Sequence, residues 1–213
     1  MITVFYTRLS YQTPDSLVAK ARECFPLPEC EKYISLLAKK GNEDSAKESL
    51  AALILLGRAA EWMGIDTNEL ILNKTENGKP YFVDSSLSFS ITHSRGAVAV
   101  ALSDEGGVGI DLETAEYDAK KARRIAERYF TEDEKKEFDV SDGKVSQRFA
   151  RIWTKKEALV KLLGITLAEQ ISGAWDIACE TSVFYRCFEI DGHPLTLCTL
   201  NEAKEVTFGE EQL

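Results

Sequence analysis

Two carboxylates stand two positions apart in the apolar segment VGIDLE, residues 108–113. In a β-strand, side chains two positions apart point to the same face, so Asp111 and Glu113 would project together while Ile110 and Leu112 face the core. Adjacent like charges repel each other, so we expect a positive group between them. Paired carboxylate oxygens suit a hard cation such as Mg²⁺. The simpler alternative is a solvated strand end, the commoner setting for an isolated Asp-x-Glu pair.

A second pair of charged residues lies in the segment WTKKEALVK, residues 153–161. On a helix, Glu157 and Lys161 would be one turn apart, which is also the spacing of an ordinary surface ion pair. Trp153 and Leu159, however, indicate that much of this turn packs against other elements. The pair could therefore be a surface ion pair or part of a site.

A third group of polar residues is the segment ITHSRG, where Thr92 and His93 stand at a predicted strand end beside Ser94 and Arg95. Hydroxyls, an imidazole and a guanidinium near turn amides could hold a phosphate, although a polar turn often needs such side chains for its own hydrogen bonds. Lys79, in GKPYF, could add a point charge or be an ordinary solvated lysine.

The elements of the first half follow from its apolar periodicity. Residues 2–6, ITVFY, predict an opening strand, and a long helix is predicted from Asp44 to Gly64, with Ser45 and Glu48 at capping-box spacing.

Three strands are then predicted, over residues 87–94, 97–102 and 106–113. The alternating or apolar patterns and the short turns between these segments predict that they lie next to one another.

In the second half, a charged helix over residues 115–130 and a helix over residues 146–164 are predicted. Between them, Thr131 and Glu134 have capping-box spacing, and the strand-like segments VFYRCFEI and LTLCTL follow, separated by a DGHP turn. Helices mixed with runs of strands predict an α+β fold.

Composition excludes several classes of function. The 213 residues carry a net charge of −9 with a pI near 4.9, which argues against sequence-independent binding of nucleic acid. The absence of a bilayer-length apolar run argues against a membrane protein, and an N-terminus without signal-peptide character leads us to expect a cytoplasmic protein. The five cysteines form no C-x-x-C pair, so we expect reduced thiols.

The ordered series GKPYF, FSITHS, GVGIDLE, RYFTEDE and RIWTKKEALVKLLG resembles the 4′-phosphopantetheinyl transferases, of the larger type associated with surfactin synthetase. The resemblance covers about residues 78–164. It implies a fold of two similar halves related by pseudo-twofold symmetry, each a small, mostly antiparallel sheet packed with a long helix, with a ligand cleft between them. The halves would be residues 1–105, with phosphate contacts, and residues 106–213, with metal-binding carboxylates.

The resemblance further implies that the chain moves phosphopantetheine from coenzyme A to a serine of an apo acyl or peptidyl carrier protein, releasing adenosine 3′,5′-bisphosphate. Asp111, Glu113 and Glu157 would hold Mg²⁺, and Lys161 would assist the leaving group at the diphosphate. Glu157 is also the candidate general base. The carrier could serve fatty acid, polyketide or nonribosomal peptide synthesis, and the family type suggests a monomer.

By the same resemblance, Lys79, Thr92 and His93 would contact coenzyme A. A basic residue usually precedes Ser-Leu in the first long helix, but this chain has Glu48, which leaves Lys47 as the candidate contact to the 3′-phosphate. Two alternatives are a Mg²⁺-dependent hydrolase of nucleotide diphosphates and a non-catalytic protein that binds coenzyme A or the carrier.

A basic segment, KKARRIAER at residues 120–128, is a candidate surface for an acidic carrier protein, although a solvated helix face explains it equally well.

Overall fold

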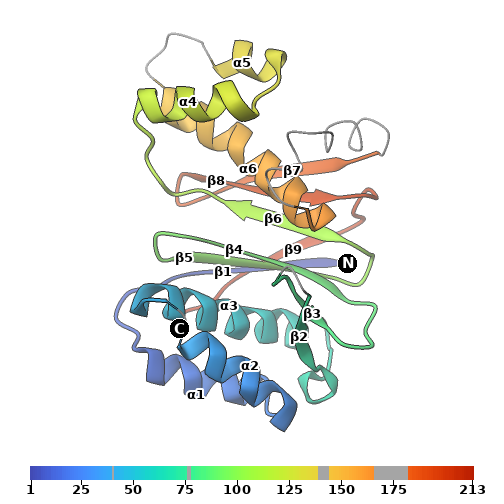
Figure 1. Cartoon of the computed structure of the whole chain (residues 1–213). Coiled ribbons are helices and arrows are strands. Elements are labelled where there is room, and N and C mark those ends of the chain that lie inside the picture. Colours follow the sequence, from blue (N-terminus) through green and yellow to red (C-terminus); the bar gives the residue numbers. More distant parts are fainter. Residues whose placement is uncertain (40, 76–77, 139–143, 166–181) are drawn as a thin grey trace.

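The computed structural model describes residues 1–39, 41–75, 78–138, 144–165 and 182–213. In these ranges the chain forms four layers, in the order helices, sheet, sheet and helices (Figure 1). This arrangement confirms the predicted α+β class. No helix within the described ranges is long and apolar enough to cross a bilayer. The four described cysteines are free thiols, and Cys179 lies outside the described residues.

The first helical layer contains α1 (Pro14–Cys24), α2 (Pro28–Ala38) and α3 (Glu43–Trp62). The sequence analysis predicted only α3. Both missed helices begin at a proline, which is favourable in the first turn because it has no N–H to leave unpaired. Thr13 caps α1 in a reciprocal arrangement with Ser16, a signal that was present in the sequence.

The predicted capping box of α3 is wrong. Asn42, not Ser45, caps the helix, because its side chain accepts a hydrogen bond from the Ser45 amide, so the cap lies three residues earlier than predicted. The carboxylate of Glu48 instead accepts a hydrogen bond from the amide of Gly96, which lies far from α3 in the sequence, in the turn of a later strand hairpin. Glu48 therefore joins α3 to the first sheet.

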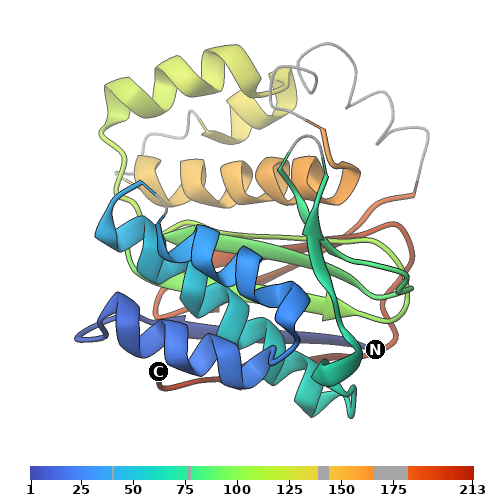
Figure 2. The ribbon, with the colours of Figure 1, turned by 60° about the horizontal axis from the view of Figure 1, so that its bottom comes forward.

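The first sheet has the strand order β4-β5-β1-β9, in which β1 spans Ile2–Arg8, β4 spans Ser88–Ser94, β5 spans Ala97–Ser103 and β9 spans Val206–Glu210. The β1–β9 pair is parallel and the other pairs are antiparallel. The last strand of the chain therefore returns to the sheet that contains the first. A short hairpin of β2 (Leu72–Lys74) and β3 (Pro80–Phe82), preceded by the 3₁₀ turn η1 (Thr67–Glu69), lies beside it (Figure 2).

The alternating sequence of β5 explains how the middle layers pack. Its alanines belong to the apolar cluster between the two sheets, whereas Val98, Val100 and Leu102 belong to the cluster under the helices. Because alternate side chains point to opposite faces, the small residues let the sheets approach each other and the large ones fill the space under α3.

The second sheet has the order β6-β8-β7, with β6 at Val108–Leu112, β7 at Phe184–Ile190 and β8 at His193–Thr199. The predicted hairpin of the last two strands is confirmed. The prediction that β6 continues the β4–β5 sheet is wrong, because β6 pairs with β8. Its other edge faces β4, whose side-chain hydroxyl oxygens accept hydrogen bonds from the buried backbone amides of β6 in place of a neighbouring strand.

The last layer contains α4 (Ala119–Tyr129), α5 (Glu132–Phe138) and α6 (Val145–Leu163). The reciprocal Thr131–Glu134 cap of α5 is confirmed. So is the end of α6 at Gly164, whose φ of 68° is a conformation that glycine adopts without strain. Stacked and edge-to-face aromatic rings around Phe149 join the three helices and so fix the N-terminal half of α6.

Candidate functional site

The site forms where β6 crosses α6. Asp111 is only 7% exposed, and its Oδ1 accepts hydrogen bonds from Lys161 Nζ at 2.7 Å and from Thr92 Oγ1 at 3.0 Å. Burial raises the pKa of Asp111, whereas the Lys161 ammonium and the Thr92 hydroxyl oppose that rise. A strand, a helix and a strand of the other sheet thus meet at one carboxylate.

Glu113 points to the same side of β6 and has three donors. Its Oε1 accepts from Ser94 Oγ and from the Ala115 amide, both at 2.8 Å, and its Oε2 accepts from the Tyr117 hydroxyl at 2.6 Å. Burial and the Glu113 carboxylate raise the pKa of Tyr117, which therefore stays a donor at neutral pH. The sequence analysis missed Tyr117, because no motif marks it and only the turn after β6 brings it back to the carboxylate.

Glu157, on α6, has a pKa raised to about 7. Burial is the largest cause, the negative charge of Asp111 the next, and Lys161 acts in the opposite direction. Glu113 also raises the pKa of Glu157, so the three carboxylates act on one another even though β6 and α6 are far apart in sequence. A carboxyl group that titrates near neutrality can both accept and release a proton there.

Hydroxyl side chains from β4 align β6 with the site. Ser90, Thr92 and Ser94 accept the amides of Ile110, Leu112 and Thr114 at 3.1, 3.2 and 3.1 Å. Two of these hydroxyls also donate to the carboxylates, Thr92 to Asp111 and Ser94 to Glu113. The alternation of hydroxyls in FSITHS therefore serves the junction between the two sheets.

Replacing Thr92 by valine is expected to lower the free energy of unfolding by about 1–3 kcal/mol, because it leaves the buried Leu112 amide without its acceptor and Asp111 without a donor. Denaturant titration measures the change. Thr92→Ser keeps the hydroxyl and should lose much less. Equal losses for the two variants would mean that side-chain packing, not the hydrogen bonds, is what Thr92 provides.

Among the described residues, no group of three or more His, Cys, Asp and Glu side chains stands ready-made for a metal ion. The donor set is nevertheless chemically suitable, since Mg²⁺ usually takes one or two protein carboxylates and fills its other positions with water and phosphate oxygens. The negative charges of Asp111 and Glu113 raise the pKa of Glu157, and this repulsion between carboxylates also favours a cation at this place. Asp111 and Glu157, with Glu113 beside them, could hold it.

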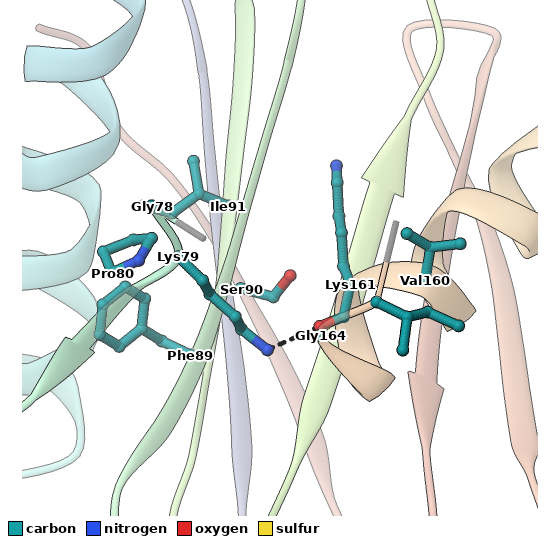
Figure 3. A pocket seen from close by; sticks show the side chains of 10 residues that line it. Gly78, Lys79, Pro80, Phe89, Ser90, Ile91, Val160, Lys161 and Gly164 are labelled. Carbon is teal, nitrogen blue, oxygen red and sulfur yellow. Dashed lines mark hydrogen bonds between the residues drawn. The ribbon is translucent and has the colours of Figure 1, made fainter. Parts of the chain in front are cut away.

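A cavity of about 310 Å³ lies between the first sheet and the C-terminal end of α6, and Lys79, Phe89 and Lys161 are among its lining residues (Figure 3). Lys79 Nζ donates to the backbone carbonyl of Lys161 at 2.6 Å, and burial lowers the pKa of Lys79. The structure therefore brings Lys79 close to the site, at the end of α6.

The other two predicted phosphate contacts lie at the N-terminal end of α3. His93 Nδ1 lies 3.0 Å from Glu48 Oε2, and Lys47 Nζ lies 2.6 Å from Glu43 Oε1. Both predicted contacts thus have a carboxylate partner from the helix itself.

Lys156 adjoins Glu157 but points away from it, into the layer of α4 and α5. Its side chain is fully buried, and its Nζ lies 2.8 Å from Glu134 Oε2 and over the ring of Phe130. Burial lowers the pKa of Lys156, whereas the Glu134 carboxylate raises it. This pair attaches α5 to α6 and so holds the helix that carries Glu157 and Lys161.

Comparison with known proteins places the chain in a family. The family model of the 4′-phosphopantetheinyl transferase superfamily matches residues 107–202. The chain is 34% identical over 131 residues to 4′-phosphopantetheinyl transferase AcpT of Escherichia coli K12, covering 58% of this chain and 63% of the relative. It is 30% identical over 195 residues to AcpT of Salmonella typhimurium, covering 88% and 84%.

A third relative, 4′-phosphopantetheinyl transferase gsp of Aneurinibacillus migulanus, is 32% identical over 136 residues, which cover 62% of this chain and 54% of the relative. The match thus spans somewhat over half the length of the Escherichia coli and Aneurinibacillus proteins. With the longer match to the Salmonella protein, these findings show that the chain belongs to the 4′-phosphopantetheinyl transferase superfamily.

Proposed function

We propose that the chain transfers the 4′-phosphopantetheine group of coenzyme A to a serine of an apo acyl or peptidyl carrier protein, releasing adenosine 3′,5′-bisphosphate. Family membership supports this activity. The observation that carries it is the meeting of Asp111, Glu157 and Lys161 where β6 crosses α6. Carboxylates and an ammonium at one point suit a diphosphate and its counter-ion.

Asp111 and Glu157 would hold Mg²⁺, with Glu113 as the third carboxylate. The ion, when bound, neutralises charge on the diphosphate oxygens. Lys161, which pairs with Asp111, would also reach the diphosphate. Thr92 and Ser94 would keep Asp111 and Glu113 oriented.

In the transfer, the serine oxygen of the carrier forms a bond to the phosphorus of the phosphopantetheine, and the bond from that phosphorus to the bridging oxygen breaks. Glu157 would accept the serine proton, because it stands beside Asp111 and Lys161 where β6 crosses α6. Lys161 donates to the departing bridging oxygen and so stabilises the negative charge that develops there.

Coenzyme A would occupy the space between the two sheet–helix units, residues 1–105 and 106–213, with β9 exchanged into the first. We propose that these units are the pseudo-twofold halves of the family fold and that the cavity beside Lys79 belongs to the ligand cleft. Lys79 and His93 would border this space, since each lines a cavity, and Lys47 would contact the ligand from α3. Thr92 would act on the ligand through Asp111, because its hydroxyl already donates there.

The exposed basic side chains of α4 would face the carrier protein. Lys120, Arg124 and Arg128 are all exposed on this helix, whereas Ala122 and Ala126 face the core. Opposite charge would bring an acidic carrier to this otherwise acidic chain and make the encounter rate fall with salt. We further propose a cytoplasmic, monomeric enzyme.

The test is intact-protein mass spectrometry of several apo carrier proteins incubated with the chain and coenzyme A, with Mg²⁺ or with a chelator. We expect a metal-dependent gain of one phosphopantetheinyl group, fastest on the natural carrier. Cleavage of coenzyme A without transfer would favour a hydrolase. Intact coenzyme A and unmodified carriers would overturn the proposed transfer and favour a binding role.

A further inference from the structure

A carboxylate lies among the predicted phosphate contacts at the N-terminal end of α3. The side chain of Glu48 is only 12% exposed. Its Oε1 accepts from the Gly96 amide at 2.9 Å, and its Oε2 lies 3.0 Å from His93 Nδ1. Two contacts from the β4–β5 turn region thus hold this negative charge in place, so it cannot turn away into solvent as a surface glutamate can.

The charges around Glu48 do not add up to an anion site. Lys47, the neighbouring cation, lies 2.6 Å from Glu43 on its own helix. A cavity of about 240 Å³ next to these residues is lined by Asp44, Lys47, Glu48 and Arg95, two acids and two bases. The first turns of α3 thus contribute three acids, Glu43, Asp44 and Glu48, and only one base, Lys47.

The space on the other side of His93 is mostly apolar. A cavity of about 140 Å³ is lined there by His93, Ser49 and Lys74, together with apolar side chains such as Leu53 and Phe89. Lys74 Nζ lies 5.0 Å from the centre of the Tyr33 ring. A mostly apolar cavity with a few polar groups at its edge suits a nucleoside better than a phosphate.

A carboxylate beside a nucleotide site affects whether the site prefers a free or a phosphorylated ribose. A carboxylate accepts hydrogen bonds from a ribose hydroxyl, and it repels a phosphate at the same position, which an arginine would accept. Dinucleotide-binding proteins distinguish NAD from NADP in this way, by an acidic residue at the ribose hydroxyl or an arginine at the ribose phosphate.

We propose that Glu48 makes this end of the site a subsite for a ribose hydroxyl, so that the preferred donor is coenzyme A without its 3′-phosphate, 3′-dephospho-coenzyme A. The inference rests on the proposed transferase function. The same bonds would change as with coenzyme A: the serine oxygen forms a bond to phosphorus, and the phosphoanhydride bond breaks. The leaving group would be adenosine 5′-monophosphate, and the serine proton would pass to Glu157.

The first experiment measures binding to the full chain by calorimetry, without a carrier, for coenzyme A and 3′-dephospho-coenzyme A. We expect the dephospho form to bind at least as tightly. Glu48→Gln should strengthen the binding of coenzyme A about tenfold by removing the repulsion, and weaken that of the dephospho form by weakening the acceptor. A general loss of fold would lower both affinities, so opposite changes identify a role in specificity.

Glu61→Gln is the matched control, because it removes the same charge from the other end of α3, where Glu61 pairs with Arg58. It should leave both affinities unchanged. A wild-type chain that binds coenzyme A about tenfold more tightly than the dephospho form would overturn the inference. So would weaker binding of coenzyme A by Glu48→Gln, since Glu48 would then support His93 as a phosphate ligand.

The same two donors are then compared in transfer to an apo carrier, with kcat/KM as the readout. Higher efficiency with the dephospho form supports the inference, and higher efficiency with coenzyme A contradicts it. If neither donor modifies any carrier, the proposed transferase function fails. The two affinities measured by calorimetry still show whether the Glu48 subsite prefers a ribose hydroxyl or a ribose phosphate.

Discussion

Gly109→Ala is expected to lower the free energy of unfolding by about 3 kcal/mol or more and to remove the site with it. A Cβ at this position in β6 would lie 2.0 Å from the carbonyl oxygen of Ala158 and 2.7 Å from the amide nitrogen of Leu162, both backbone atoms of α6. Backbone cannot move aside as a side chain can, so strand and helix must separate. Because β6 carries Asp111 and α6 carries Lys161, their 2.7 Å contact would be lost.

Gly107→Ala is the matched control, since a Cβ there would lie 3.2 Å from the end of the flexible Leu162 side chain. It should cost far less, because a methyl group can shift by a few tenths of an ångström. Denaturant unfolding of both variants measures the difference. Equal stability of the two variants would mean that β6 and α6 do not approach each other as closely as the structure has them.

Asp111→Asn is expected to lower kcat/KM for transfer to the carrier about a thousandfold. The amide is nearly isosteric, but it carries no charge to hold a divalent cation and none to pair with Lys161. The neutral side chain is also easier to bury, so the fold should remain intact. Stability and activity should therefore change independently in this variant, unlike in Gly109→Ala.

Asp104→Asn makes the same substitution at an exposed aspartate that pairs with the N-terminal amine, and it should leave transfer unchanged. Mg²⁺ titration of the two variants, followed by thermal unfolding, separates metal binding from chemistry, because only the Asp111 variant should lose stabilisation by the metal. If Asp111→Asn transferred phosphopantetheine within about threefold of the wild-type rate, Asp111 would not be a ligand of an essential metal.

The predicted elements that came out as expected are those with complete local signals. Residues 146–164 have an apolar stripe and a terminal glycine, and α6 ends at Gly164. The hairpin of the last two strands also followed from short-range patterns, although its turn is Asp191-Gly192 alone, because His193 and Pro194 already belong to β8. Two helices in residues 14–38 were missed, although Pro14 and Pro28 stood at their first positions. The apolar stripe of α1 is short, and its packing against α3 supplies the rest of its stability.

The partner of β6 could not be predicted from the sequence. The segment 106–113 follows β5 directly, so a third strand in the same sheet was the simplest prediction, yet β6 pairs with β8 some 85 residues later. Pairing depends on which partner buries the most surface, and that choice involves the whole chain. The hydroxyls of β4 that accept the β6 amides could be recognised as a group only after both strands were placed.

For this protein, the sequence by itself determined which side chains are candidates for the chemistry, because strand periodicity puts Asp111 and Glu113 on one face and helical periodicity puts Glu157 and Lys161 one turn apart. Only the tertiary structure decided how those pairs meet. Gly109 lets β6 lie directly on α6, and burial there brings the pKa of Glu157 to about 7. Glu48 illustrates the same division, since its predicted local role as a helix cap gave way to distant partners, His93 and Gly96. Local rules fix the direction of a side chain within its element, whereas burial and charge pairing depend on the elements packed against it.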